Sequence, residues 1–151
     1  MRRRRAGVLM ASWLAALPMP AFGQATPDEA KALAERAAAH MRAVGAQQAI
    51  ADFSDPAGSY RDRNLFVVTY DPQRKVVSSV GVPAYLGRDA TRFRDDDGKE
   101  FGKAIIATAE THGAGWVDYR MTNPASRKVE RKSSYVIKVG DYILMVGAYR
   151  P

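Results

Sequence analysis

The sequence predicts an α+β domain in which helices cover a five-stranded antiparallel sheet. Three features predict it: a helical pattern of apolar residues after residue 26, β-rich segments grouped first as a pair and then as a trio, and a second helical stretch between the two groups. Segments joined by short turns pair antiparallel, and helices outside such a run collect on the sheet. A length of 151 residues fits one domain.

The N-terminal segment has the pattern of a secretory signal peptide. Four arginines at positions 2–5 precede an apolar run at 6–17, which is shorter than the roughly 20 residues that a membrane span needs. Prolines and small residues follow, which predicts cleavage after Gly23 or Ala25. We expect residues 1–25 to be removed on export, leaving 26–151 in the periplasm or secreted. An uncleaved membrane anchor is the alternative.

Removal of this segment changes the charge of the chain. The formal net charge of +7 loses four arginines and becomes +3, because all 16 acidic residues lie further along. No Lys/Arg-rich helix remains, so nucleic acid is not expected as a partner.

The absence of cysteine excludes disulfides and cysteine-ligated zinc. No metal and no cofactor are expected, since a calcium loop built around Gly98 would need acidic residues at Phe93 and Ala104.

The mature chain begins with a long helix. Thr26 is placed as its N-cap, with Glu29 in position to complete a capping box. An apolar stripe continues to Val44, and such a stripe has to be buried against the sheet. Gly45 interrupts the pattern, which resumes over residues 46–53.

A strand pair and an irregular connection follow. A loop over 55–64 leads to strands at 65–70 and 76–80, which form a hairpin. The connection from 81 to 97 is long for a compact domain, and we expect its residues 83–93 to cover a site.

The second helix and three strands complete the domain. The helix is expected over 99–112, with the acidic residues 95–97 at its N-terminus, where the helix dipole favours them. A Gly-Ala-Gly stop at 113–115 precedes the strands. These are expected at 116–121, 129–139 and 142–149, and the last two are joined by a two-residue turn.

The order of elements and several motifs resemble the type 2 branch of the single Cache domain family. The motifs are DPAGSYRDRNLFVVTYDPQRKVV, GRD with DDDGKEF, GWVDY, a lysine at position 132 before SSYV, and the closing GAYRP. The resemblance implies a PAS-like fold and extracytoplasmic sensing of small molecules, with acetate, propionate, pyruvate or lactate as ligands of several relatives. Most relatives lie between two membrane helices, whereas this chain ends at its last strand. A membrane-bound signalling or transport partner is therefore expected, and a homodimer is possible.

Candidate ligand-binding residues lie in the predicted sheet. A carboxylate needs a cation and hydrogen-bond donors. Lys132 is the candidate cation, and Gly147 a place where backbone approaches a ligand. The candidate hydroxyl donors are Tyr70, Tyr119, Tyr135 and Tyr149. Strand alternation puts only one of Lys132 and Tyr135 in the pocket unless a bulge intervenes.

Each candidate also has a purely structural interpretation. Lys132 could lie on a solvated face, and Tyr70 and Tyr149 could be residues of the sheet rim. Trp116 is expected in the core under the first helix, and Arg120 in solvent or a salt bridge. The favoured function is a soluble binding module for a short-chain carboxylate. The alternative is an assembly protein that uses the same fold with a filled pocket. An enzyme is not expected, because no nucleophile, phosphate-loop or histidine motif occurs.

Overall fold

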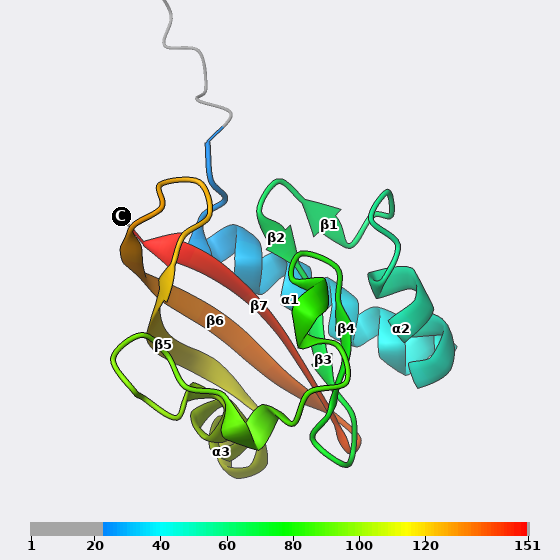
Figure 1. The fold of residues 1–151 in the computed structure, drawn as a ribbon. Helices are drawn as coiled ribbons and strands as arrows, with labels where there is room; N and C mark the ends of the chain where they lie inside the picture. The colour runs from blue at the N-terminus through cyan, green and yellow to red at the C-terminus, as the bar shows by residue number, and fades with distance from the viewer. Residues whose placement is uncertain (1–22, 151) are drawn as a thin grey trace, which may run out of the picture.

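The computed structural model describes residues 23–150, so nearly all of the expected signal peptide lies outside the described part. The elements appear in the predicted order (Figure 1). They are α1 Pro27–Val44, α2 Ala46–Phe53, β1 Arg61–Asp62, β2 Leu65–Phe66, β3 Val68–Tyr70, β4 Val76–Ser79, the 3-10 turns η1 Pro83–Tyr85 and η2 Ala90–Arg92, α3 Phe101–His112, β5 Ala114–Thr122, β6 Val129–Val139 and β7 Tyr142–Arg150.

The main sheet has five strands in the order β4-β3-β7-β6-β5, and all neighbours are antiparallel. This arrangement confirms the predicted α+β class. The tight turn between β6 and β7 passes through Gly140, whose φ of 58° lies in the left-handed region that glycine adopts without strain. The three long strands β5, β6 and β7 lie side by side, and β3 pairs with β7.

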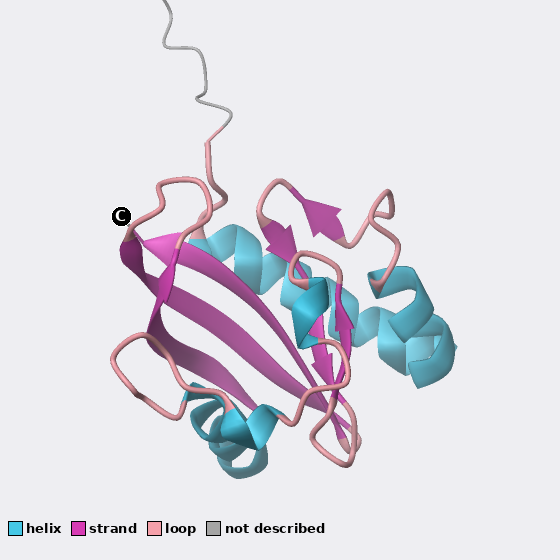
Figure 2. Cartoon of the chain, viewed as in Figure 1, coloured by secondary structure: helices cyan, strands magenta, loops and turns pink. Residues whose placement is uncertain are grey.

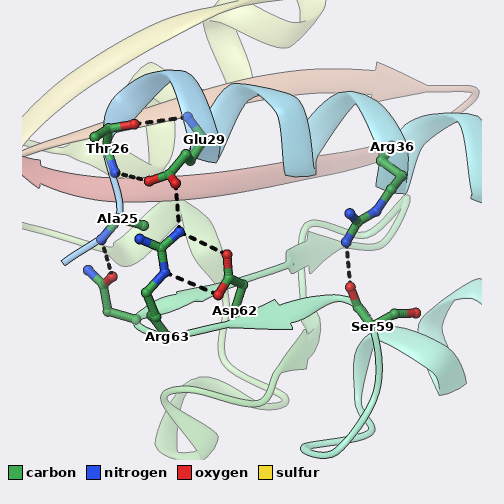
Figure 3. A network of polar contacts seen from close by, with 8 residues as sticks. Ala25, Thr26, Glu29, Arg36, Ser59, Asp62 and Arg63 are labelled. Atoms are coloured by element: carbon green, nitrogen blue, oxygen red, sulfur yellow. Dashed lines mark hydrogen bonds and ion pairs between the residues drawn. The ribbon is translucent and has the colours of Figure 1, made fainter. Parts of the chain in front are cut away.

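Helix α1 begins as the sequence predicts. The Thr26 hydroxyl accepts a hydrogen bond from the Glu29 amide at 3.2 Å, and the Glu29 carboxylate accepts one from the Thr26 amide at 2.7 Å. Arg63 links Glu29 and Asp62, which ties the start of α1 to the β1–β2 ribbon (Figure 3). These contacts fix the ribbon relative to the helix.

The sheet separates two layers of different content (Figure 2). Helices α1 and α2 pack on one face, where the buried side of α1 meets alternate residues of β6 and β7 such as Ile137, Leu144 and Val146. Helix α3 and the 81–100 connection lie on the other face, over Val136, Ile143 and Met145. This alternation decides which strand residues face which layer.

Two details differ from the predictions. The expected strand 65–70 is divided, because Leu65–Phe66 pairs with β1 whereas Val68–Tyr70 joins the main sheet beside β7. The acidic residues before α3 are not in its first turn. Instead, Asp95 accepts backbone N–H bonds from Lys99 and Arg120, which fastens this loop to the edge strand β5.

Candidate functional site

A cavity of about 240 Å³ lies over the face of the sheet opposite α1. Its floor comes from β3, β5, β6 and β7, and its cover comes from the 81–101 segment and the β5–β6 connection. The described residues that line it are mostly apolar or aromatic, and Lys132 is the one charged residue among them. They are Phe66, Val68, Tyr70, Val82, Tyr85, Phe93, Phe101, Tyr119, Met121, Thr122, Pro124, Lys132, Ser134, Met145, Gly147 and Tyr149.

The strand register places three predicted site residues side by side. Lys132 in β6 is opposite Tyr119 of β5 and Tyr149 of β7. Two residues further along β6, Ser134 is opposite Gly147 of β7, and both lie on the same face as Lys132. Tyr70 comes from β3, at the far end of the same cavity floor. Five of the six predicted residues therefore line one cavity.

Lys132 has no acidic partner among the described residues. Its Nζ lies 4.9 Å from the centroid of the Tyr149 ring and 5.7 Å from that of Phe66, so aromatic faces stand where a counterion is usual. Burial lowers the pKa of Lys132 from 10.5 to about 8, because desolvation disfavours the ammonium form. At neutral pH the side chain is still mainly protonated and carries an uncompensated charge.

Gly147 has a role that differs from the one predicted. A Cβ at this position would lie 2.6 Å from Lys132 Cε and 2.5 Å from Ser134 Oγ. The Lys132 side chain therefore lies against this backbone, which still forms part of the cavity lining. Gly147 lets the lysine lie flat along the floor, and the ammonium group lies near the Tyr149 and Phe66 rings.

The tyrosine hydroxyls differ in whether they still have a proton free to donate to a ligand. Tyr119 and Ser134 share one hydrogen bond of 2.7 Å, so one of these two hydroxyls keeps a free proton. Tyr149 donates to the carbonyl of Thr122 at 3.2 Å. The Tyr70 hydroxyl has no hydrogen-bond partner among residues 23–150, and burial raises its pKa well above the usual value of 10. Neutral hydrogen-bond donors are thus present near the Lys132 ammonium group and at the far end of the cavity floor.

Tyr135 does not reach the cavity, which corrects its prediction as a site residue. The β6 register runs without a bulge, so Tyr135 points to the α1 face, against Trp116 and Lys31. Trp116 is 38% exposed and so is not the core residue that was expected, because α1 does not extend over the edge strand β5. Arg120 pairs with Asp97, in agreement with the salt-bridge interpretation.

The sequence did not identify the cover of the cavity residue by residue. Tyr85 and Phe93 lie in the 83–93 stretch that was expected to cover the site, and they contact each other with ring centroids 5.0 Å apart. Phe101 continues this contact to Tyr119 at 4.5 Å. The only available signal was the density of aromatic residues in an otherwise polar connection.

A second cavity of about 240 Å³ adjoins the first and shares Lys132 with it. Its lining is more polar and includes Arg61, Asn64 and Asn123. The Asn64 carbonyl oxygen accepts a bond from the Ala25 amide, while its amide nitrogen is buried without a hydrogen-bond partner in the described chain. Lys132 thus lies between an aromatic chamber and a polar one.

Metal binding has no cluster of side chains to support it in the described residues. No group of three or more His, Asp or Glu side chains within residues 23–150 is arranged to hold a metal ion. His40 pairs with Asp52 at 2.6 Å, but this pair joins α1 to α2 on the face away from the cavity. No helix in the same range combines the length and apolar character needed to cross a membrane.

Three solved structures align with this fold over most of the chain. A methyl-accepting chemotaxis protein from Vibrio parahaemolyticus aligns with a TM-score of 0.67 at 16% identity, covering 81% of this chain and 86% of that one. A periplasmic sensor domain of a chemotaxis protein aligns with a TM-score of 0.62 at 23% identity, covering 82% and 90%. A Cache chemosensory domain described for carboxylic acid recognition aligns with a TM-score of 0.61 at 23% identity, covering 82% and 88%.

No curated protein matches the sequence. At these identities the structural matches establish the fold alone. The sequence profile described as Single Cache domain 2, in contrast, matches residues 21–150, which is nearly the whole chain. The helix order, the antiparallel sheet and the profile agree, and the chain therefore belongs to the single Cache domain 2 family.

Proposed function

We propose that this domain is an extracytoplasmic sensing module that binds a small organic carboxylate over the sheet, with Lys132 as the cation. The observation that carries the proposal is the uncompensated ammonium group in an aromatic cavity. Burying a charge without a partner costs several kcal/mol. The faces of the Tyr149 and Phe66 rings offset part of this cost, and a bound carboxylate would supply the full counter-charge.

The hydrogen-bond donors fit the same ligand. A carboxylate has two oxygens with about four acceptor sites, so one cation leaves acceptor capacity unused. The hydroxyl pair of Tyr119 and Ser134 keeps one proton next to the position of the ammonium group. The absence of acidic residues from the lining, within the described chain, means that no repulsive charge opposes the anion.

The open cavity also supports ligand binding over the assembly alternative. A scaffold with no ligand is expected to fill this space with side chains, as protein interiors normally are filled. The volume of about 240 Å³ beside Lys132 approaches the few hundred Å³ typical of small-molecule sites. Homodimerisation stays an expectation, since α1 uses its buried side on the sheet.

The family supports the sensing role and the compartment. One structural relative is described as the periplasmic sensor domain of a chemotaxis protein and another by its recognition of carboxylic acids. By analogy, a change at the ligand site would be passed to a membrane-bound partner. The expected signal peptide agrees with a periplasmic or secreted location for residues 26–151.

Isothermal titration calorimetry with acetate, propionate, pyruvate and lactate tests the proposal, using the wild type and Lys132→Met. Lys138→Met is the matched control, because Lys138 lies in the same strand but pairs with Glu110 at the surface. We expect saturable binding to the wild type. Lys132→Met should weaken this binding by about 2 to 5 kcal/mol, as for the loss of one partner of a buried pair. Lys138→Met should bind as the wild type does. Equal binding by the two variants would refute the role of Lys132.

A further inference from the structure

The aromatic chamber is longer than a two- or three-carbon acid requires. We propose that the ligand is a monocarboxylate with an aromatic ring of about phenylacetate size, whose ring lies in the chamber away from Lys132. The inference rests on the proposed carboxylate site and specifies the class of ligand that the site takes.

The volume of the chamber favours a ligand that carries a ring. An apolar cavity of about 150 Å³ is enough to hold benzene. The chamber has about 240 Å³, which leaves room for a ring and a carboxylate together. Acetate would leave most of this volume to water, although the chamber wall offers that water few polar partners beyond the hydroxyl groups.

The length of the cavity floor favours the same class of ligand. The Lys132 side chain lies over Gly147, so Gly147 marks the level of the floor at which the end of that side chain lies. Met145 and its neighbour Val68 lie two residues further along the strands, about 7 Å away, and the pair of Ile143 and Tyr70 lies about 13 Å away. A ligand anchored at the ammonium group must extend by a ring to contact Val68 and Met145.

The walls of the chamber are rich in aromatic side chains. Four rings form a continuous row of contacts, from Tyr85 through Phe93 and Phe101 to Tyr119, with centroids 5.0, 5.7 and 4.5 Å apart. Tyr70 adds an edge-to-face contact with Phe93 at 6.4 Å. Such faces and edges pair well with another aromatic ring.

The charge of the cavity lining further restricts the class of ligand. Lys132 is its one charged residue in the described chain, so a second carboxylate would find no second cation inside. An α-amino group would likewise find no acidic partner and would repel Lys132. Free amino acids, and dicarboxylates whose second charge lies inside the chamber, are therefore disfavoured by buried, unpaired charge.

Calorimetry on the wild type with a size series tests this inference. The probes are acetate, propionate, benzoate and phenylacetate, with phenylacetamide and phenylalanine as charge controls. We expect phenylacetate to bind at least tenfold more tightly than acetate, because each buried CH₂ equivalent contributes about 0.8 kcal/mol, or roughly fourfold. Phenylacetamide and phenylalanine should bind at least tenfold more weakly than phenylacetate.

Val68→Phe tests the position of the ring, since it fills the chamber beside Met145. Val129→Phe is the control, because Val129 is 41% exposed and outside the cavity. Val68→Phe should weaken phenylacetate at least tenfold and change acetate less than threefold, while Val129→Phe changes neither. Circular dichroism and thermal melting establish that each variant is folded; if Val68→Phe does not fold, the wild-type series decides the question.

The outcomes separate the two proposals. If acetate or propionate binds as tightly as phenylacetate, and depends on Lys132, the aromatic class is wrong and the carboxylate site stands. If no carboxylate in either series binds, both proposals fail. If phenylacetamide binds as well as phenylacetate, the chamber takes the ring but the carboxylate is not what Lys132 recognises.

Discussion

Replacing Lys132 by methionine should make the unliganded protein more stable. The substitution removes an ammonium group that has no acidic partner in the described chain and keeps an apolar side chain of similar length. Exchanging a buried charge for a well-packed apolar group is commonly neutral or stabilising. A residue retained only for the fold would be expected to show the opposite effect.

The magnitude follows from the lowered pKa of Lys132. A fall from 10.5 to about 8 corresponds to roughly 3 kcal/mol, since one pKa unit is worth about 1.4 kcal/mol. Part of the side chain is open to the two cavities, where solvent screens the charge, so we expect a gain of about 2 kcal/mol. For a domain of this size the gain raises the melting temperature by about 5 to 10 °C.

The gain should depend on pH in a defined direction. Below about pH 8 the lysine is protonated in both folded and unfolded states, and the full cost of the buried charge applies. Between the folded pKa of about 8 and the unfolded value of 10.5, the unfolded state binds more protons, so wild-type stability rises relative to the variant. The difference should nearly disappear at pH 10.5.

Urea unfolding of both proteins at a series of pH values from 6.5 to 10.5 measures this difference, and shared titrations of other groups cancel in the subtraction. Lys138→Met is again the control and should show no such trend, because Lys138 is paired with Glu110. A Lys132→Met protein that is less stable than the wild type at pH 7, or whose difference is independent of pH, would refute the reasoning.

Three further predictions concern the site and the first helix. Gly147→Ala should fold, at a cost of about 1 to 3 kcal/mol, and should bind carboxylate more weakly in calorimetry, because its Cβ displaces Lys132. Gly115→Ala, which meets one methyl group at 3.0 Å, should bind normally. Carboxylate affinity should fall as pH rises above about 8, since Lys132 loses its proton, and an affinity that stays constant to pH 10 would contradict this. Thr26→Ala should lower the free energy of unfolding by about 0.5 to 2 kcal/mol in urea titration, whereas Thr111→Ala on exposed α3 surface should not.

Regular patterns made the floor of the site predictable from sequence. Alternation along β6 separated Lys132 and Ser134 from Ser133 and Tyr135, and the structure keeps that separation because the strand has no bulge. The Thr26 capping box was equally readable, since it depends on residues three apart in the chain.

The cover and the fine geometry were not predictable in the same way. Tyr85 and Phe93 belong to irregular backbone, whose path is set by tertiary contacts and not by a repeating pattern. The function of Gly147 depends on where the Lys132 side chain lies, which a sequence does not specify. Asp95 was assigned to the helix dipole, but its carboxylate instead binds the backbone of a strand 25 positions away.

The most direct test of the central claim is the pKa of Lys132 itself, measured by NMR titration of the Nζ and Cε signals with and without a saturating carboxylate. The Lys132→Met variant assigns the signal. We expect a Lys132 pKa of about 8 in the free protein, and a value about one unit or more higher when the bound anion pairs with the ammonium group. A Lys132 pKa that is the same in the free and the saturated protein would contradict it.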